Sequence, residues 1–176
     1  MKVAESRLEK RCAALKRVKG TFSLSDAREI GVIFNASDPV NLEGVKKFVA
    51  QLQELNPRIF VIGYVNDKKV NDISLLRSGF NYFTLKNLSW FLKPVSPFID
   101  EFLNRHFDIL FDLDLDNLYP LKYIASLSKA GMRVGRFFEE CDYLDFMIKT
   151  DPEQSVAFLI EQAMYYLNMV RKPESV

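Results

Sequence analysis

Short apolar runs alternate with amphipathic segments along most of this chain. The apolar runs are nearly continuous and rich in valine, isoleucine and phenylalanine, as in Ile30-Gly-Val-Ile-Phe34. Runs of this kind are typical of strands that are buried on both faces of a parallel sheet. On this pattern we predict strands at residues 30–34, 58–64, 80–84, 107–113, 132–136 and 143–148.

Between these runs, apolar residues recur at three- and four-residue spacing, which predicts helices. Gly20 is placed to end the first helix, and Ser37 or Asp38 to cap the second. Residues 66–79 are polar and irregular, and residues 88–92 predict either a short helix or a turn of packed aromatic side chains. The predicted helices span residues 3–19, 40–55, 98–105, 118–130 and 152–170.

This alternation of strands and helices predicts a single α/β domain over residues 1–176. An amphipathic, basic N-terminal helix within residues 1–20 would precede a sheet-and-helix core at residues 28–172. Because crossovers between parallel strands are right-handed, helices would cover both faces of the sheet. The expected fold is therefore a three-layer domain with a mostly parallel, doubly wound sheet, either Rossmann-like or flavodoxin-like.

Composition adds little about partners, except at the N-terminus. The chain is 48% hydrophobic and 27% charged, which fits a soluble globular protein, and its net charge of +1 favours no class of partner. Residues 1–20, however, contain seven lysines and arginines against two glutamates. The apolar stripe of this helix is narrow and has no aromatic residue, which disfavours nucleic acid and membrane as partners. We predict that the helix packs on the sheet or on a partner protein.

Several familiar kinds of chemistry are excluded by residue usage. Cys12 and Cys141 form neither a disulfide framework nor a zinc spacing, and with His106 as the only histidine a Ser-His-Asp arrangement is not expected. Glycine-rich dinucleotide and Walker motifs are absent from the sequence, so no cofactor is predicted. The N-terminus is too charged for a signal peptide, and no apolar run is long enough to span a bilayer, so we expect a cytoplasmic protein.

Polar residues follow the first and fourth predicted strands. In open α/β sheets, ligands bind at the carboxyl ends of the strands where the strand order reverses. If the order reverses between residues 30–34 and 107–113, the loops after these two strands flank the crevice. The candidate site residues are then Asn35, Ser37 and Asp38 after the first strand, and Asp112, Asp114, Asp116 and Asn117 after the fourth.

Two interpretations of these loops remain open. In the first, Ser37 and the following helix N-terminus hold an anion, or Asp112, Asp114 and Asp116 hold a divalent cation, which prefers several oxygen ligands. In the second, the aspartates are a solvated strand end on which Asp116 or Asn117 caps the next helix. The acidic row also disfavours a phosphate on its side of the crevice.

Three stretches of the chain carry a resemblance to a known family: Ser25-Asp-Ala-Arg-Glu-Ile-Gly-Val-Ile-Phe34, Phe107-Asp-Ile-Leu-Phe-Asp-Leu113 and Tyr119-Pro-Leu-Lys-Tyr-Ile-Ala-Ser-Leu-Ser-Lys-Ala-Gly-Met-Arg-Val-Gly135. On these stretches the whole chain resembles a small family of bacterial proteins of unknown function, found mainly among Bacteroidetes. The resemblance implies an α/β fold and no chemistry.

Residues 107–137 also resemble the N-terminal half of heptosyltransferase-like glycosyltransferases. There, too, a strand that ends in an acidic residue leads into a helix, a Gly/Ala turn and a short strand like Arg133-Val-Gly-Arg136. We expect a single domain, without the second Rossmann-like domain in which such enzymes bind their nucleotide sugar, so no catalytic residue carries over.

The leading functional hypothesis is a non-enzymatic Rossmann-like module for protein interaction or small-ligand binding. It would act through the crevice, or as a homodimer or with a protein partner through the N-terminal or C-terminal helix. Phe158, Tyr165 and Tyr166 are the aromatic candidates for contact on the C-terminal helix. The alternative is a metal- or nucleotide-dependent transferase-like enzyme that uses the acidic strand end from Asp112 to Asp116.

Overall fold

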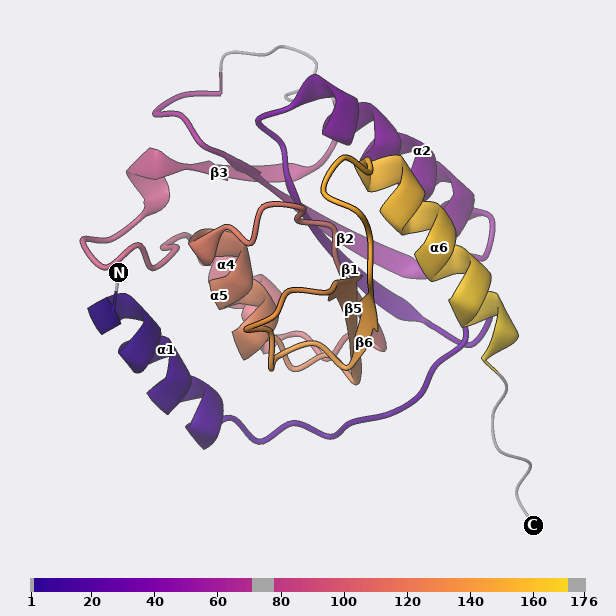
Figure 1. Ribbon diagram of the computed structural model, residues 1–176, viewed down its shortest axis with the longest axis horizontal. Coiled ribbons are helices and arrows are strands. Elements are labelled where there is room, and N and C mark those ends of the chain that lie inside the picture. Colours follow the sequence, from indigo (N-terminus) through magenta and orange to yellow (C-terminus); the bar gives the residue numbers. More distant parts are fainter. Residues whose placement is uncertain (1, 71–77, 171–176) are drawn as a thin grey trace.

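The described residues, 2–70 and 78–170 of a computed structural model, form an open α/β fold (Figure 1). Their sheet has six strands, all parallel, in the order β3-β2-β1-β4-β5-β6. The expected doubly wound fold is confirmed, and this order is the Rossmann-like one rather than the flavodoxin-like one. The strands are β1 (Glu29–Asn35), β2 (Arg58–Val65), β3 (Asn81–Thr84), β4 (Ile109–Asp112), β5 (Met132–Arg136) and β6 (Phe146–Ile148).

Helices cover both faces of this sheet, as right-handed crossovers require. Helices α2 and α6 pack together on one face, and α4 and α5 pack on the other (Figure 1). Helix α1 lies outside this three-layer arrangement and contacts α5. The helices are α1 (Lys2–Ala14), α2 (Pro39–Gln53), α4 (Pro97–Asn104), α5 (Tyr119–Leu127) and α6 (Val156–Met169), with a 3-10 turn η1 (Leu85–Asn87).

Each face of the sheet has its own apolar core. Under α2 and α6, Phe48 packs edge-on against Phe111 of β4, with ring centroids 4.9 Å apart. Under α4 and α5, Phe102 and Phe107 pack with centroids 4.6 Å apart. Strand residues buried on both faces explain why the strands read as continuous apolar runs.

The first predicted helix is shorter than its periodicity indicated. Helix α1 ends at Ala14, so Gly20 does not end it. Residues 15–20 are instead held in a non-helical course by hydrogen bonds to the loop before β5. The Gly20 N–H donates to the Gly131 carbonyl at 3.0 Å, and the Arg17 side chain donates to the Ala130 carbonyl at 3.0 Å. These tertiary contacts override the helical pattern of residues 15–19.

Three other predictions need correction, two near the C-terminus and one in the middle of the chain. Strand β6 begins three residues later than predicted, and α6 begins only after Ser155, whose side chain caps it by accepting from the Phe158 N–H at 3.3 Å. Residues 88–92 form a turn, as one of the two alternatives predicted, but Trp90 does not pack within it, because its side chain is 93% exposed.

Residues 71–77 of the polar stretch predicted at 66–79, and residues 171–172 of the predicted core, lie outside the described residues. Within the described ranges, no helix has the length and apolar character needed to cross a membrane. The single-domain and cytoplasmic assignments stay predictions.

Candidate functional site

The strand order places the two predicted polar loops at the same point of the sheet. Strands β1 and β4 are neighbours, with Ile33 paired with Asp112, so both loops leave the carboxyl ends of adjacent strands at the switch point. Across this crevice, the Asn35 amide nitrogen donates to a carboxylate oxygen of Asp116 at 3.1 Å. The two loops that were predicted to flank the crevice are therefore neighbours, and a hydrogen bond between their own side chains joins them.

Asp114 holds its own loop together. Its side chain is 3% exposed, one carboxylate oxygen accepts from the Asp116 N–H at 3.0 Å, and the other accepts from the Leu118 N–H just before α5. The expected capping residues, Asp116 and Asn117, do not have this role. Asn117 adopts a left-handed conformation with φ of 52°, which turns the chain so that Asp114 reaches the Leu118 N–H.

Asp112 is buried beneath the crevice at 3% exposure. One of its oxygens accepts from the Tyr143 hydroxyl at 3.4 Å, and the other accepts from the Asp114 N–H at 3.3 Å. Burial, and then the neighbouring Asp114 carboxylate, raise the pKa of Asp112 to about 8. The side chain therefore favours its neutral form near neutral pH.

Burial also raises the pKa of Asp114, to about 6, although the N–H groups of Asp116 and Leu118 favour its charged form. Burial, and then the carboxylate of Asp112, raise the pKa of Tyr143. Asp112 and Asp114 are thus not the solvated strand end that one interpretation expected, because both lie inside the protein.

Ser37 and Asp38 are likewise engaged within the fold. The Ser37 hydroxyl accepts from the Asn66 N–H at 2.9 Å, and its own N–H donates to the Asn35 side-chain oxygen at 3.0 Å. Asp38 caps α2 by accepting from the Val40 N–H at 2.8 Å. The carboxylate of Asp38 thus occupies the helix N-terminus at which an anion was expected to bind.

The three aspartates do not converge as ligands of one cation would. Asp114 directs both oxygens to backbone N–H groups, and Asp116 reaches across to Asn35. Among the residues that the structure describes, no three His, Cys, Asp or Glu side chains are grouped to hold a metal ion. The interpretation of Asp112, Asp114 and Asp116 as a cation site therefore finds no support in their arrangement.

The hydrogen bond between Asn35 and Asp116 yields a first prediction. A double-mutant cycle with Asn35→Ala and Asp116→Ala should give a coupling of about 0.5–1 kcal/mol in the free energy of unfolding, the usual range for a hydrogen bond of this kind. Chemical denaturation of the four proteins measures it. Additive effects would show that the two loops are not held together in solution.

A groove with apolar, aromatic and cationic side chains lies beside α1, away from the crevice. This groove of about 310 Å³ separates α1 from the turn at residues 88–94, and we name it the α1 groove. Its apolar and aromatic lining includes Leu8, Phe91, Tyr119 and Tyr123. Its charged lining consists of Arg7, Lys10, Arg11 and Lys93.

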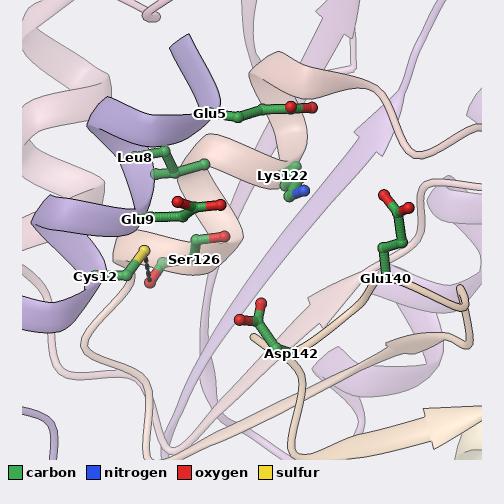
Figure 2. Close-up of a pocket in the computed structure, with 8 residues that line it drawn as sticks. All are labelled: Glu5, Leu8, Glu9, Cys12, Lys122, Ser126, Glu140 and Asp142. Atoms are coloured by element: carbon green, nitrogen blue, oxygen red, sulfur yellow. Dashed lines mark hydrogen bonds between the residues drawn. The ribbon is translucent and has the colours of Figure 1, made fainter. Parts of the chain in front are cut away.

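A different cavity, of about 300 Å³, lies on the other side of α1 (Figure 2). Figure 2 shows Glu5, Glu9 and Cys12 of α1 across from Lys122, Glu140 and Asp142. The Cys12 thiol donates to the Ser126 carbonyl at 3.8 Å, and burial raises the pKa of Cys12. Helix α1 therefore presents glutamates to one cavity and arginines and lysine to the other.

The sequence did not point to Tyr143 at the crevice or to the residues that form the α1 groove. Tyr143 beneath the crevice comes from the loop before β6, 31 residues after Asp112, and no local pattern links the two. The α1 groove joins segments that lie far apart along the chain. A lone tryptophan between aromatic and apolar neighbours, at Trp90, is the one sequence signal that could have drawn attention to it.

Comparison with known proteins identifies the family to which this chain is related. A family model described as "Family of unknown function (DUF6913)" matches residues 1–170. Among solved structures, the chain is similar to E. coli heptosyltransferase WaaC with ADP, at a TM-score of 0.49 and 11% identity over 84% of this chain and 49% of that chain. It is also similar to E. coli heptosyltransferase WaaC with ADP-2-deoxy-2-fluoro heptose, at a TM-score of 0.49 and 13% identity over 84% of this chain and 50% of that one.

The chain spans about half the length of these solved structures, and the likeness concerns the fold alone. A comparison with curated proteins found no match. The resemblance to a family of unknown function is confirmed, and the similar solved structures are heptosyltransferases, as the second resemblance indicated. An origin in Bacteroidetes stays a prediction.

Proposed function

This chain belongs to the family of unknown function DUF6913, and we propose that it is a non-enzymatic, Rossmann-like binding module that contacts a protein partner beside α1. One observation carries the proposal: exposed apolar side chains gather in one short segment next to α1. Trp90 is 93% exposed, and Leu85, Phe91, Leu92 and Val95 are exposed as well. Contiguous exposed apolar residues of this kind mark interaction surfaces.

The polar side chains at the crevice also favour a binding role over an enzymatic one, because they are engaged in contacts within the fold. Asp114 and Asp38 satisfy backbone N–H groups, Asp116 binds Asn35, and Asp112 is buried. These side chains are engaged in holding the fold, which leaves the alternative of a transferase-like enzyme at Asp112–Asp116 with less support than a binding role.

A homodimer through the C-terminal helix is a second candidate, favoured by a separate exposed patch. Tyr165, Tyr166 and Met169 of α6 and Met147 of β6 are all exposed, and the Tyr166 ring lies 6.0 Å from the ring of Phe146 in β6. Strand β6 is the last strand of the sheet in the described residues, and edge strands can pair with a strand of a second chain.

A photo-crosslinking experiment tests both candidates. A benzophenone amino acid replaces Trp90, Tyr165 or, as a control of matched exposure, Val18, which is 89% exposed. After irradiation of intact cells that naturally contain the protein, we expect a discrete adduct with another protein at position 90 and none at position 18. Adducts of equal yield at positions 90 and 18, or none at position 90, would refute a partner beside α1. An adduct of twice the chain mass at position 165 would establish the homodimer.

A further inference from the structure

Resting on the proposed function, we infer that the α1 groove binds an acidic segment of the partner protein, anchored by an apolar or aromatic side chain. Apolar and aromatic side chains form one part of the lining of the groove. Leu8, Tyr119 and Tyr123 are supplied by α1 and α5, and Phe91 by the turn at residues 88–94. A groove of about 310 Å³ with these walls accepts a large side chain, which is how partner peptides anchor in clefts.

The positive charge of the groove indicates that acidic residues flank the anchoring side chain of the partner. Four cationic side chains line it, and none of its described lining residues is acidic. None of the ion pairs between described residues involves Arg7, Lys10, Arg11 or Lys93. Among the residues that the structure describes, these cations therefore have no ion-pair partner, and an acidic partner segment would complement them.

Aromatic rings hold two of these cations at the groove. The Arg7 guanidinium lies 3.8 Å from the centroid of the Phe91 ring, and Arg11 donates to the Tyr123 hydroxyl. A guanidinium stacked on a ring keeps N–H groups free for a carboxylate. The glutamates of α1, Glu5 and Glu9, line the cavity on its other side (Figure 2), so they do not neutralise the groove.

The turn beside the groove is built to project a side chain. The Ser89 N–H donates to the Lys93 carbonyl at 2.9 Å, the Leu92 N–H donates to the Ser89 carbonyl at 2.9 Å, and Leu92 is left-handed with φ of 58°. A leucine in this conformation is strained, and such strain concentrates at binding sites. Trp90 stands at the tip of this turn, between Ser89 and Phe91, both of which line the groove.

A protein segment fits this surface better than a lipid bilayer does. The aromatic and apolar walls face a concave groove, which a bilayer surface, being nearly flat, cannot fill. A peptide side chain can fill it while neighbouring carboxylates reach Arg7 and Lys93. The exposed tryptophan then covers the anchor from outside, as interface tryptophans do.

Selection from a phage-displayed library of random peptides tests this inference on the whole protein. We expect the enriched peptides to carry net negative charge and at least one Leu, Phe or Trp, and to bind about tenfold more weakly to Phe91→Ala and to Lys93→Glu. Lys47→Glu, a charge reversal on the exposed face of α2, is the matched control and should bind as the wild type does. Binding should also weaken as salt is added.

The outcomes separate this inference from the proposed function. Neutral or basic peptides that still require Phe91 would overturn the acidic partner and leave the interaction surface standing. Enriched peptides that bind Phe91→Ala and Lys93→Glu with full affinity would overturn both. A library from which no peptide is enriched would also overturn both. In that case, vesicles of phosphatidylglycerol that bind the wild type but not Phe91→Ala would assign the surface to a membrane.

Discussion

Replacing Asp112 with asparagine is expected to stabilise the protein at neutral and alkaline pH. In the folded state, burial raises the pKa of Asp112 from 3.8 to about 8. Between these two values the unfolded chain loses the proton while the folded chain keeps it, so the stability of the wild type falls as pH rises. Below 3.8 the side chain is neutral in both states and has no effect. Asparagine removes this loss because it cannot ionise.

The size of the gain follows from the same shift. Even one unit of pKa corresponds to roughly 1.4 kcal/mol, so Asp112→Asn should increase the free energy of unfolding by at least about 1 kcal/mol at the upper end of this window. Asparagine keeps an oxygen that can accept from the Tyr143 hydroxyl or the Asp114 N–H. Denaturant titrations of both proteins over a range of pH values measure the difference.

Two further variants sharpen this experiment. Tyr143→Phe removes a hydrogen bond that favours the charged carboxylate, so the loss of stability caused by Asp112 should continue to a higher pH than in the wild type. Asp151→Asn removes an exposed carboxylate away from this loop and controls for the change in net charge. If Asp112→Asn is less stable than the wild type at every pH, the carboxyl group makes contacts in the fold that an amide cannot replace, and the expected gain in stability is wrong.

The fold was predictable because its signals are local and repeated. Strands buried on both faces, such as Ile30-Gly-Val-Ile-Phe34, leave continuous apolar runs, and the rule for switch points then placed the loops after β1 and β4 side by side. All the crevice residues named from the sequence lie on the two loops that meet there. What they do could not be predicted, since it depends on which N–H groups each carboxylate reaches.

Asp114 illustrates this limit. From spacing alone, Asp116 or Asn117 was the expected cap of the next helix, yet the left-handed turn at Asn117 brings the Leu118 N–H to Asp114. The α1 groove illustrates a second limit, because α1, the turn at residues 88–94 and α5 come together only in three dimensions. Neither periodicity nor composition reports on contacts between segments so far apart.

Removing the carboxylate of Asp145 is expected to be strongly destabilising, because it is the anion that ties the N-terminal segment to the sheet. Its two oxygens accept from the Arg17 guanidinium, each at 2.5 Å, and one also accepts from the Arg133 N–H at 2.9 Å. Lys19 adds an ion pair at 3.1 Å. The Arg17 side chain is 7% exposed and that of Asp145 16%, so water cannot replace these partners fully.

Asp145→Ala would leave Arg17 without an anion beside the buried guanidinium of Arg133. Burial, and then the charge of Arg17, already lower the pKa of Arg133 to about 10. Removing one partner of a partly buried ion pair with several hydrogen bonds costs about 2–3 kcal/mol, and we expect a loss of this size in the free energy of unfolding. Asp142→Ala, which removes an exposed carboxylate from the same loop, is the matched control and should cost much less.

The pH dependence of this contribution runs opposite to that of Asp112. Burial alone would raise the pKa of Asp145, but hydrogen bonds from Arg17, the Arg133 N–H and Lys19 lower it to about 2. Its stabilisation is therefore complete above 3.8 and is lost as pH falls through about 2. Asp145→Ala should lack this acid dependence and should also expose the bonds after Arg17 and Lys19 to trypsin, because the segment that follows α1 is no longer held. Trypsin resistance equal to that of the wild type would mean that other contacts of this segment, such as the bond from Gly20 to Gly131, suffice to hold it in place.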